Sequence, residues 1–217
     1  MTTALLFDLD GTLVDSEDGI VDSLQHALRA MGRPAMTRDE AVPLIGPPLL
    51  DTFRALLGDD ALARQAVGAY KRHYDASGWR RFRVYPGIEA AVRELHARGH
   101  RLAVATSKTE RFARRILAEL PFGACFADVT GTSEDGSLRY KADLIAEAMR
   151  RGGLAAGSAL MIGDRRMDIE GARARGLRSL GVLWGFGDAA ELRLAGATGL
   201  VRAPAELPAA VAALPAG

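Results

Sequence analysis

Short apolar runs alternate with segments of helical spacing along most of the chain. A brief continuous apolar run that ends in a turn is typical of a buried parallel strand. Runs of this kind occupy Ala4–Phe7, Leu102–Ala105, Ala159–Ile162 and Ser179–Leu183. Between them, helical faces are formed by Ile88, Ala91, Val92 and Leu95, by Phe112, Ile116 and Leu117, and by Leu144, Ile145, Ala148 and Met149. This alternation predicts an α/β fold with a Rossmann-like parallel sheet covered by helices on both faces.

The segment from about Val14 to Val84 departs from this alternation. No part of it predicts a strand, and its apolar residues recur at helical intervals, as at Ile20, Leu24 and Leu28. An α-helical domain inserted after the first strand is the simplest interpretation. We therefore assign residues 1–14 and 85–217 to the core and residues 15–84 to the inserted domain.

Composition and charge exclude several classes of protein. The 28 basic and 27 acidic residues nearly cancel, so no basic excess points to nucleic acid. No stretch approaches the roughly 18 apolar residues of a membrane-spanning helix, and the N-terminus lacks the basic start of a signal peptide. Cys125 is the single cysteine, so an internal disulfide is excluded. We expect a soluble cytoplasmic protein with neither nucleic acid nor membrane as a partner.

The basic residues divide very unevenly between arginine and lysine. The chain contains 25 Arg and 3 Lys, at positions 71, 108 and 141. Lysine presents a compact point charge, whereas arginine presents a planar fork of donors. A position that keeps Lys in this chain therefore favours a need for a point charge.

Two aspartates directly follow the first predicted strand, in the sequence Asp8-Leu9-Asp10-Gly11-Thr12. Ligands of an open parallel sheet bind beyond the carboxyl ends of its strands. Residues i and i+2 face the same side of a strand, so both carboxylates can face one crevice. Two close carboxylates repel each other, and a divalent cation relieves the repulsion. The alternative is a turn with helix-capping acids.

Three weaker motifs lie at later strand-to-helix junctions. The hydroxyls and backbone N–H groups of Thr106-Ser107-Lys108 suit a phosphate oxygen, although an ordinary helix cap has the same composition. Lys141 begins a helix, where its charge opposes the dipole unless an anion is near, or it is a solvated surface charge. Asp164 and Asp168 provide a second acidic group at a strand end, or else cap the following helix. Their order along the chain makes the set more specific than any member.

The four motifs together resemble the haloacid dehalogenase superfamily of phosphatases over nearly the whole chain. The stretch from Gly163 to Gly187 and the sequences Gly46-Pro-Pro-Leu49 and Val104-Ala-Thr-Ser-Lys108 are similar to the phosphoglycolate phosphatase-like branch. The resemblance implies that the helical insertion is that family's cap domain. It also implies a Mg²⁺-dependent phosphomonoester hydrolase acting on a small metabolite.

The resemblance further assigns catalytic roles to the acids. Asp8 would be the nucleophile that forms an aspartyl-phosphate, and Asp10 the general acid and then base. Mg²⁺ would bind Asp8, the backbone carbonyl of Asp10, and Asp164, with waters completing its shell. Asp168 would hold a metal-bound water rather than the ion itself.

The same resemblance places the phosphate between three polar groups. Thr106 and the Ser107 N–H would bind the transferring phosphoryl group. Lys141 would balance its charge and orient Asp8.

Rival functions differ in what they require of the site. A dehalogenase has no need of a second acid, which Asp10 argues against. A phosphomutase shares every motif residue and differs in its cap, and a non-catalytic relative would be expected to lack a motif. The resemblance favours phosphoglycolate as the substrate, with 5′-nucleotidase action on nucleoside monophosphates as the alternative. The motifs fit a monomer or a homodimer equally well.

Overall fold

The computed structural model describes residues 4–155 and 157–214. The chain divides into two compact units, one containing the residues up to Asp15 and those from Val84 onward, the other Ser16–Arg83. Residues 1–3, 156 and 215–217, which the sequence assigns to the core, lie outside the described residues.

The first unit is built on a parallel sheet. Within the described residues this sheet has six strands in the order β5-β4-β1-β6-β7-β8, and each neighbouring pair is parallel. The strands are β1 (Ala4–Phe7), β4 (Arg101–Thr109), β5 (Phe126–Thr132), β6 (Ala159–Gly163), β7 (Arg178–Val182) and β8 (Gly199–Val201). The α/β prediction and all four predicted strands are confirmed.

Two strands of the sheet were not expected. Strand β5 carries polar residues at Asp128, Thr130 and Thr132, which interrupt its apolar pattern. Strand β8 has 3 residues, too few to show a period. Both strands lie at the edges of the sheet, where fewer apolar side chains are needed to cover them.

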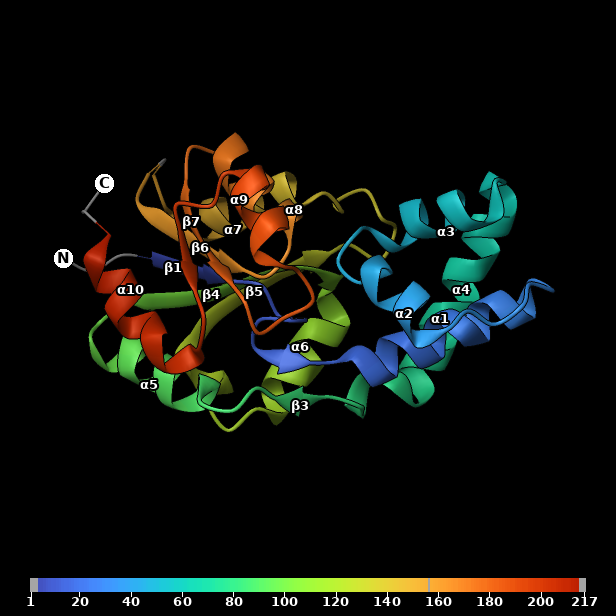
Figure 1. The fold of residues 1–217 in the computed structure, drawn as a ribbon, viewed down its shortest axis with the longest axis horizontal. Coiled ribbons are helices and arrows are strands. Elements are labelled where there is room, and N and C mark those ends of the chain that lie inside the picture. The colour runs from blue at the N-terminus through green and yellow to red at the C-terminus, as the bar shows by residue number, and fades with distance from the viewer. Residues whose placement is uncertain (1–3, 156, 215–217) are drawn as a thin grey trace. The chain divides into compact units, whose positions relative to one another are not determined.

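Six helices pack on this sheet in the described part of the first unit. They are α5 (Ile88–Ala97), α6 (Glu110–Glu119), α7 (Lys141–Gly152), α8 (Arg166–Ala174), α9 (Ala189–Ala195) and α10 (Leu207–Ala213). Figure 1 shows α7 and α8 above the strands and α5 and α10 below them. Leu6 packs with Ile145 of α7 and Ala172 of α8 on the upper face. The successive side chains of β1 are all buried, because both faces of the sheet are covered.

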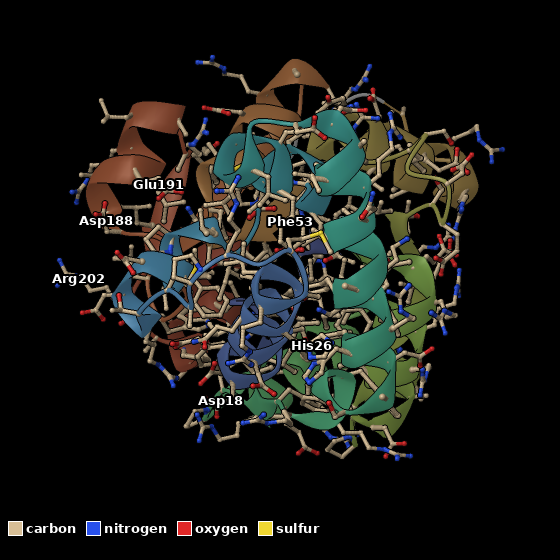
Figure 2. The ribbon with its side chains drawn as sticks, turned by 90° about the vertical axis from the view of Figure 1, so that its right-hand side faces the viewer. Asp18, His26, Phe53, Asp188, Glu191 and Arg202 are labelled. Atoms are coloured by element: carbon tan, nitrogen blue, oxygen red, sulfur yellow. The ribbon has the colours of Figure 1, made fainter. Side chains whose placement is uncertain are left out.

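The second unit is helical. Its helices are α1 (Glu17–Ala30), α2 (Arg38–Ala41), α3 (Leu49–Leu57) and α4 (Asp60–Ala76), and α4 packs against both α1 and α3. Phe53, labelled in Figure 2, is buried inside this unit, with its ring centroid 6.5 Å from that of Tyr70. Ile20, Leu24 and Leu28 are buried as their spacing predicts. By contrast, Leu49, Leu50 and Leu56 are only half-buried.

Two very short strands correct the expectation that the segment from Val14 to Val84 has none. Val14–Asp15 (β2) and Arg83–Val84 (β3) pair with each other in a two-stranded sheet. Each strand has 2 residues, so no alternating pattern could reveal it. Short 3₁₀ turns complete the secondary structure at Val42–Leu44, Gly78–Arg80, Gly123–Cys125 and Pro204–Glu206.

The strand order identifies the ligand-binding edge of the sheet. From β1 the chain passes to β4 and β5 on one side and then crosses to β6 and β7 on the other. Such a reversal leaves a crevice beyond the carboxyl ends of the central strands. The motif residues that follow β1 and β6, and those in the last part of β4, therefore meet at this edge.

No helix in the described ranges has both the length and the apolar character needed to span a bilayer.

Candidate active site

Lys141 joins two of the motif aspartates. It is the first residue of α7, and its ammonium Nζ lies 2.9 Å from Asp8 Oδ1 and 2.7 Å from Asp168 Oδ1. Nζ also donates to the carbonyl oxygen of Ala105 at 3.0 Å. Burial opposes the positive charge, but the attraction of Asp168 and Asp8 outweighs it and raises the pKa of Lys141. Lys141 is therefore a buried, charged group and not a solvated surface cation.

Three carboxylates form a compact acidic cluster beside this ammonium. Asp8, Asp164 and Asp168 are all buried, and each offers an oxygen that lies within 4.8 Å of the other two. Burial and the nearby charges of Asp168 and Asp8 raise the pKa of Asp164 well above its usual value. Burial likewise raises the pKa of Asp168 to about 6, although Lys141 opposes the shift. Without a cation, the cluster therefore resists full ionisation.

The donor set of this cluster fits a hard divalent cation. All three groups are carboxylate oxygens, the ligands that Mg²⁺ and Ca²⁺ prefer. Full ionisation of the three carboxylates beside one ammonium would leave two negative charges in a buried space. A divalent ion would neutralise that charge and reverse the upward shift of the pKa values. Asp8, Asp164 and Asp168 are accordingly the residues whose side chains could hold the ion.

Backbone and hydroxyl donors orient Asp164, which immediately follows β6. The Thr12 hydroxyl donates to Asp164 Oδ1 at 3.0 Å, and the Phe186 N–H donates to Oδ2 at 2.9 Å. The indole N–H of Trp184 donates to the Thr12 carbonyl at 3.0 Å, which joins the loop after β7 to the loop after β1. The sequence analysis quoted Thr12 as part of the first motif but assigned no role to it, to Trp184 or to Phe186, and the nearby Gly185 and Gly187 were a signal of a close approach.

Two glycines make room for the acidic side chains. Gly11 has a φ of +82°, and a Cβ there would collide with the Asp164 carboxylate. A Cβ on Gly163 would collide with the side chain of Asp168. The Asp168 side chain turns back to accept from the Arg165 N–H at 3.0 Å, which fixes it at the start of α8. Asp164 and Asp168 are thus brought together, as their spacing suggested.

The Asp10 side chain lies outside the acidic cluster and forms an ion pair with a different lysine, Lys108. Lys108 Nζ lies 2.8 Å from Asp10 Oδ2, and the two side chains are 5% and 12% exposed. The sequence resemblance implies that Asp10 contacts the metal through its backbone carbonyl. The acidic cluster is defined by side-chain oxygens, so this contact stays a prediction. The sequence analysis singled out Lys108 among the three lysines but did not predict its contact with Asp10.

Thr106 and Ser107 lie within β4 and not in a helix cap. Strand β4 continues to Thr109, and α6 begins at Glu110. The ladder with β5 is irregular between Ala105 and Thr109, so the strand bends where the predicted phosphate-binding residues lie. Thr106 is buried, and its hydroxyl oxygen accepts from the Lys108 N–H at 3.3 Å. The helix-cap alternative for this motif is therefore wrong.

An ion pair supports the start of α8 from the neighbouring helix. Arg165 Nε lies 3.0 Å from Glu191 Oε1, and the same oxygen accepts from the Arg166 N–H at 2.7 Å. Figure 2 shows Glu191 and Asp188 close together, and the Asp188 side chain caps α9 by accepting from the Glu191 N–H. Sequence reasoning assigned no role to Arg165.

Comparison with known proteins tests the resemblance. Residues 5–182 match the haloacid dehalogenase-like hydrolase family. The chain belongs to this family. The predicted superfamily, its α/β fold and its hydrolase class are confirmed.

Individual relatives of the family carry several names. The chain is 43% identical to a 5′-nucleotidase of Pseudomonas aeruginosa, over 87% of this chain and 86% of that protein. It is 42% identical to the tyrosine-protein kinase PtkA of Mycobacterium tuberculosis over 85% of its length, but spans only 63% of PtkA. A phosphoglycolate phosphatase of Aliivibrio fischeri is 29% identical over 84% of each chain.

A solved structure agrees with the whole fold. It is the crystal structure of a predicted phosphatase from Clostridium acetobutylicum, with a TM-score of 0.95 and 36% identity. The match covers 99% of this chain and 100% of that one.

Proposed function

We propose that the chain is a Mg²⁺-dependent phosphomonoester hydrolase that acts on a small metabolite through an aspartyl-phosphate on Asp8. The arrangement that carries this proposal is the ammonium of Lys141 between Asp8 and Asp168, beside the buried Asp164. A phosphate dianion repels a carboxylate nucleophile, so a site for it must neutralise charge and fix the direction of attack. The family match and the phosphatase-named relatives support the same reaction class.

Asp8 attacks the phosphorus atom of the substrate, and Lys141 orients it for this step. Lys141 holds Oδ1 of Asp8, which sets the orientation of the carboxylate before a substrate arrives. When bound, Mg²⁺ supplies positive charge for the phosphoryl oxygens. Asp164 and Asp8 would bind it, and Asp168, fixed by Lys141 and the Arg165 N–H, would orient the water of its shell.

Asp10 and the β4 residues complete the reaction. Asp10 gives a proton to the departing alkoxide and later takes one from the water that hydrolyses the aspartyl-phosphate. The Thr106 hydroxyl and the Ser107 N–H bind the phosphoryl oxygens. Thr106 is buried at the bend of β4, where a small hydroxyl fits such an oxygen.

Two substrate classes suit this chemistry. The sequence resemblance favours phosphoglycolate. The 43% identity to a 5′-nucleotidase, against 29% to a phosphoglycolate phosphatase, favours nucleoside monophosphates as the second candidate. A phosphomutase of the same fold differs in retaining the phosphate on its product.

We also propose that the Ser16–Arg83 unit is the cap that selects the leaving group. An insertion this long is usually functional. Gly46 has a φ of +114° and Pro48 immediately precedes α3, so this turn has a defined shape. Changes at Gly46, Pro47 or Pro48 should alter the ranking of substrates more than the hydrolysis of acetyl phosphate. An equal loss on every substrate would contradict a selective cap.

Phosphate release tests the proposed reaction. The purified chain with Mg²⁺ should release inorganic phosphate from phosphoglycolate or a nucleoside monophosphate, and exhaustive chelation should abolish the release. Ca²⁺ should inhibit, because its larger and looser shell misplaces the nucleophile. Full activity after chelation would contradict the metal site. Incubation with ATP and detection of phosphotyrosine tests the activity named for PtkA, and the proposed hydrolase should form none.

A further inference from the structure

Each aspartate after β1 is paired with a different lysine. Lys141 contacts Asp8, and Lys108 contacts Asp10 with 2.8 Å between Nζ and Oδ2. The chain has only 3 Lys against 25 Arg. Two of these three lysines contact this one pair of acids. The third, Lys71, lies on α4 in the helical unit. The choice of lysine thus coincides with the acids of the proposed reaction.

The backbone that carries Lys108 is tightly held by β5. A Cβ on Gly131 would lie 2.6 Å from the Lys108 carbonyl oxygen, so the close approach of the two strands requires glycine there. The Thr132 hydroxyl donates to the Ser107 carbonyl at 2.7 Å, one residue earlier. The register of β4 against β5 shifts between Ala105 and Thr109, the stretch that contains Lys108. The bend that presents Lys108 is therefore fixed by contacts with its neighbouring strand.

The Lys108–Asp10 pair is largely buried. The Lys108 side chain is 5% exposed, so its ammonium depends on fixed partners more than a surface cation does. The Asp10 side chain does not belong to the cluster that could hold the cation. Lys108 therefore contacts the carboxylate that we propose as the general acid, and not a carboxylate of the metal cluster. A general acid must lie about 2.6–3.2 Å from the oxygen that it protonates. A misplacement of about 1 Å in an active site costs on the order of 100-fold in rate.

We propose that Lys108 is a positioning residue that holds the Asp10 carboxyl group in line with the leaving oxygen. This inference rests on the proposed phosphomonoesterase reaction. As the P–O bond to the leaving group breaks and the bond to Asp8 forms, the Asp10 proton passes to the departing oxygen. Water then attacks phosphorus, the bond to Asp8 breaks, and a water proton returns to Asp10. Lys108 takes no part in these proton transfers and acts by fixing Asp10.

The test compares two esters that differ in their need for a general acid. p-Nitrophenolate departs without a proton, whereas phenolate benefits from one. Lys108→Met in the full chain with Mg²⁺ should lower kcat on phenyl phosphate about 100-fold, at the low end of the effect of a general acid. The rate of p-nitrophenolate release in a single turnover, which needs no proton from Asp10, should change less than about threefold, and neither ester should bind more weakly, because the Asp8 site is intact.

A double variant separates positioning from any other role. If Lys108 acts through Asp10, then Lys108→Met should add less than about threefold to the defect of Asp10→Asn. The double variant also removes both buried charges, so it should fold even if Lys108→Met does not. Lys108→Gln, with a neutral side chain able to donate to Asp10, provides a second single variant.

Arg98→Met is the matched control. Arg98 also pairs with a carboxylate, that of Glu94, but lies at the end of α5, before β4 begins. It should leave kcat on both esters unchanged. Equal losses on both esters with a raised KM would show that Lys108 binds the phosphate, and unchanged kcat in both Lys108 variants would show that it has no role. Either result overturns the positioning role alone, whereas failure of the parent to hydrolyse either ester overturns the proposed function itself.

Discussion

The Thr12 hydroxyl donates a 3.0 Å hydrogen bond to Asp164 Oδ1, although the two residues lie 152 positions apart in the chain. Thr12 belongs to the loop after β1 and Asp164 to the loop after β6, and both side chains are fully buried. The two strands are neighbours in the sheet, so a side chain of one loop orients a carboxylate of the other. This contact lets the acidic cluster be tested without removing any of its acids.

Thr12→Val should weaken Mg²⁺ binding about 10–100-fold, the usual effect of removing a group that orients a metal ligand. Thr12→Ser keeps the hydroxyl and should bind nearly as the parent does. The measurement is the Mg²⁺ concentration that gives half of the maximal thermal stabilisation, which requires no activity. Equal affinities for the Val and Ser variants would contradict an orienting role for Thr12.

Asp8→Asn should abolish turnover while the fold persists. An amide cannot carry the phosphoryl group, and we expect a loss of at least ~10³-fold in kcat. Because Lys141 still faces Asp168, the metal-free variant should unfold at a temperature close to that of the parent. Activity within about tenfold of the parent would refute Asp8 as the nucleophile.

Lys141→Met should destabilise the metal-free protein by about 3–5 kcal/mol, because it leaves buried carboxylates without their cation. Added Mg²⁺ should recover part of this loss, since the ion neutralises the same carboxylates. Chemical unfolding with and without Mg²⁺ provides the measurement. A loss that is the same in both conditions would show that Lys141 and the ion do not share a site.

Mg²⁺ binding should weaken as the pH falls. Burial raises the pKa of Asp168 to about 6 in the folded protein. A carboxyl group of this kind lowers the free energy of unfolding as the pH rises from the pKa of the unfolded chain to that of the folded protein. The pKa of Asp164 is raised in the same direction. Metal binding requires the ionised acids, so affinity at pH 5 should be about tenfold lower than at pH 7.5. Thermal shifts across this range measure it, and a flat profile would contradict the raised pKa values.

Gly11→Ala should disrupt the acidic cluster, whereas Gly176→Ala should not. Both glycines have a positive φ, +82° and +68°, so both substitutions introduce backbone strain of about 1 kcal/mol. Only Gly11 approaches Asp164, while nothing lies within 4 Å of a Cβ at Gly176. Mg²⁺-dependent stabilisation should therefore be lost in the first variant and retained in the second. A similar loss in both would mean that strain, rather than the collision, is responsible.

The amino-acid sequence by itself determined the central strands and the acids that follow them. Continuous apolar runs mark β1, β4, β6 and β7, because strands covered on both faces need apolar side chains at every position. The positions of Asp8, Asp10 and Asp164 after those runs then placed them at one edge of a parallel sheet. The helical insertion was visible for the same reason, since its apolar residues follow a helical period.

Only the tertiary structure decided which side chains meet at that edge. Strands β5 and β8 were missed because edge strands need less apolar cover, and their patterns are weak. The grouping of Asp168 with Asp8, and the contact of Lys108 with Asp10, join residues that are far apart in the chain. Hydrophobic spacing reports which side of an element is buried but not which element lies beside it. Neighbouring positions at the site follow from strand order and from close backbone approaches, which exist only in the packed sheet.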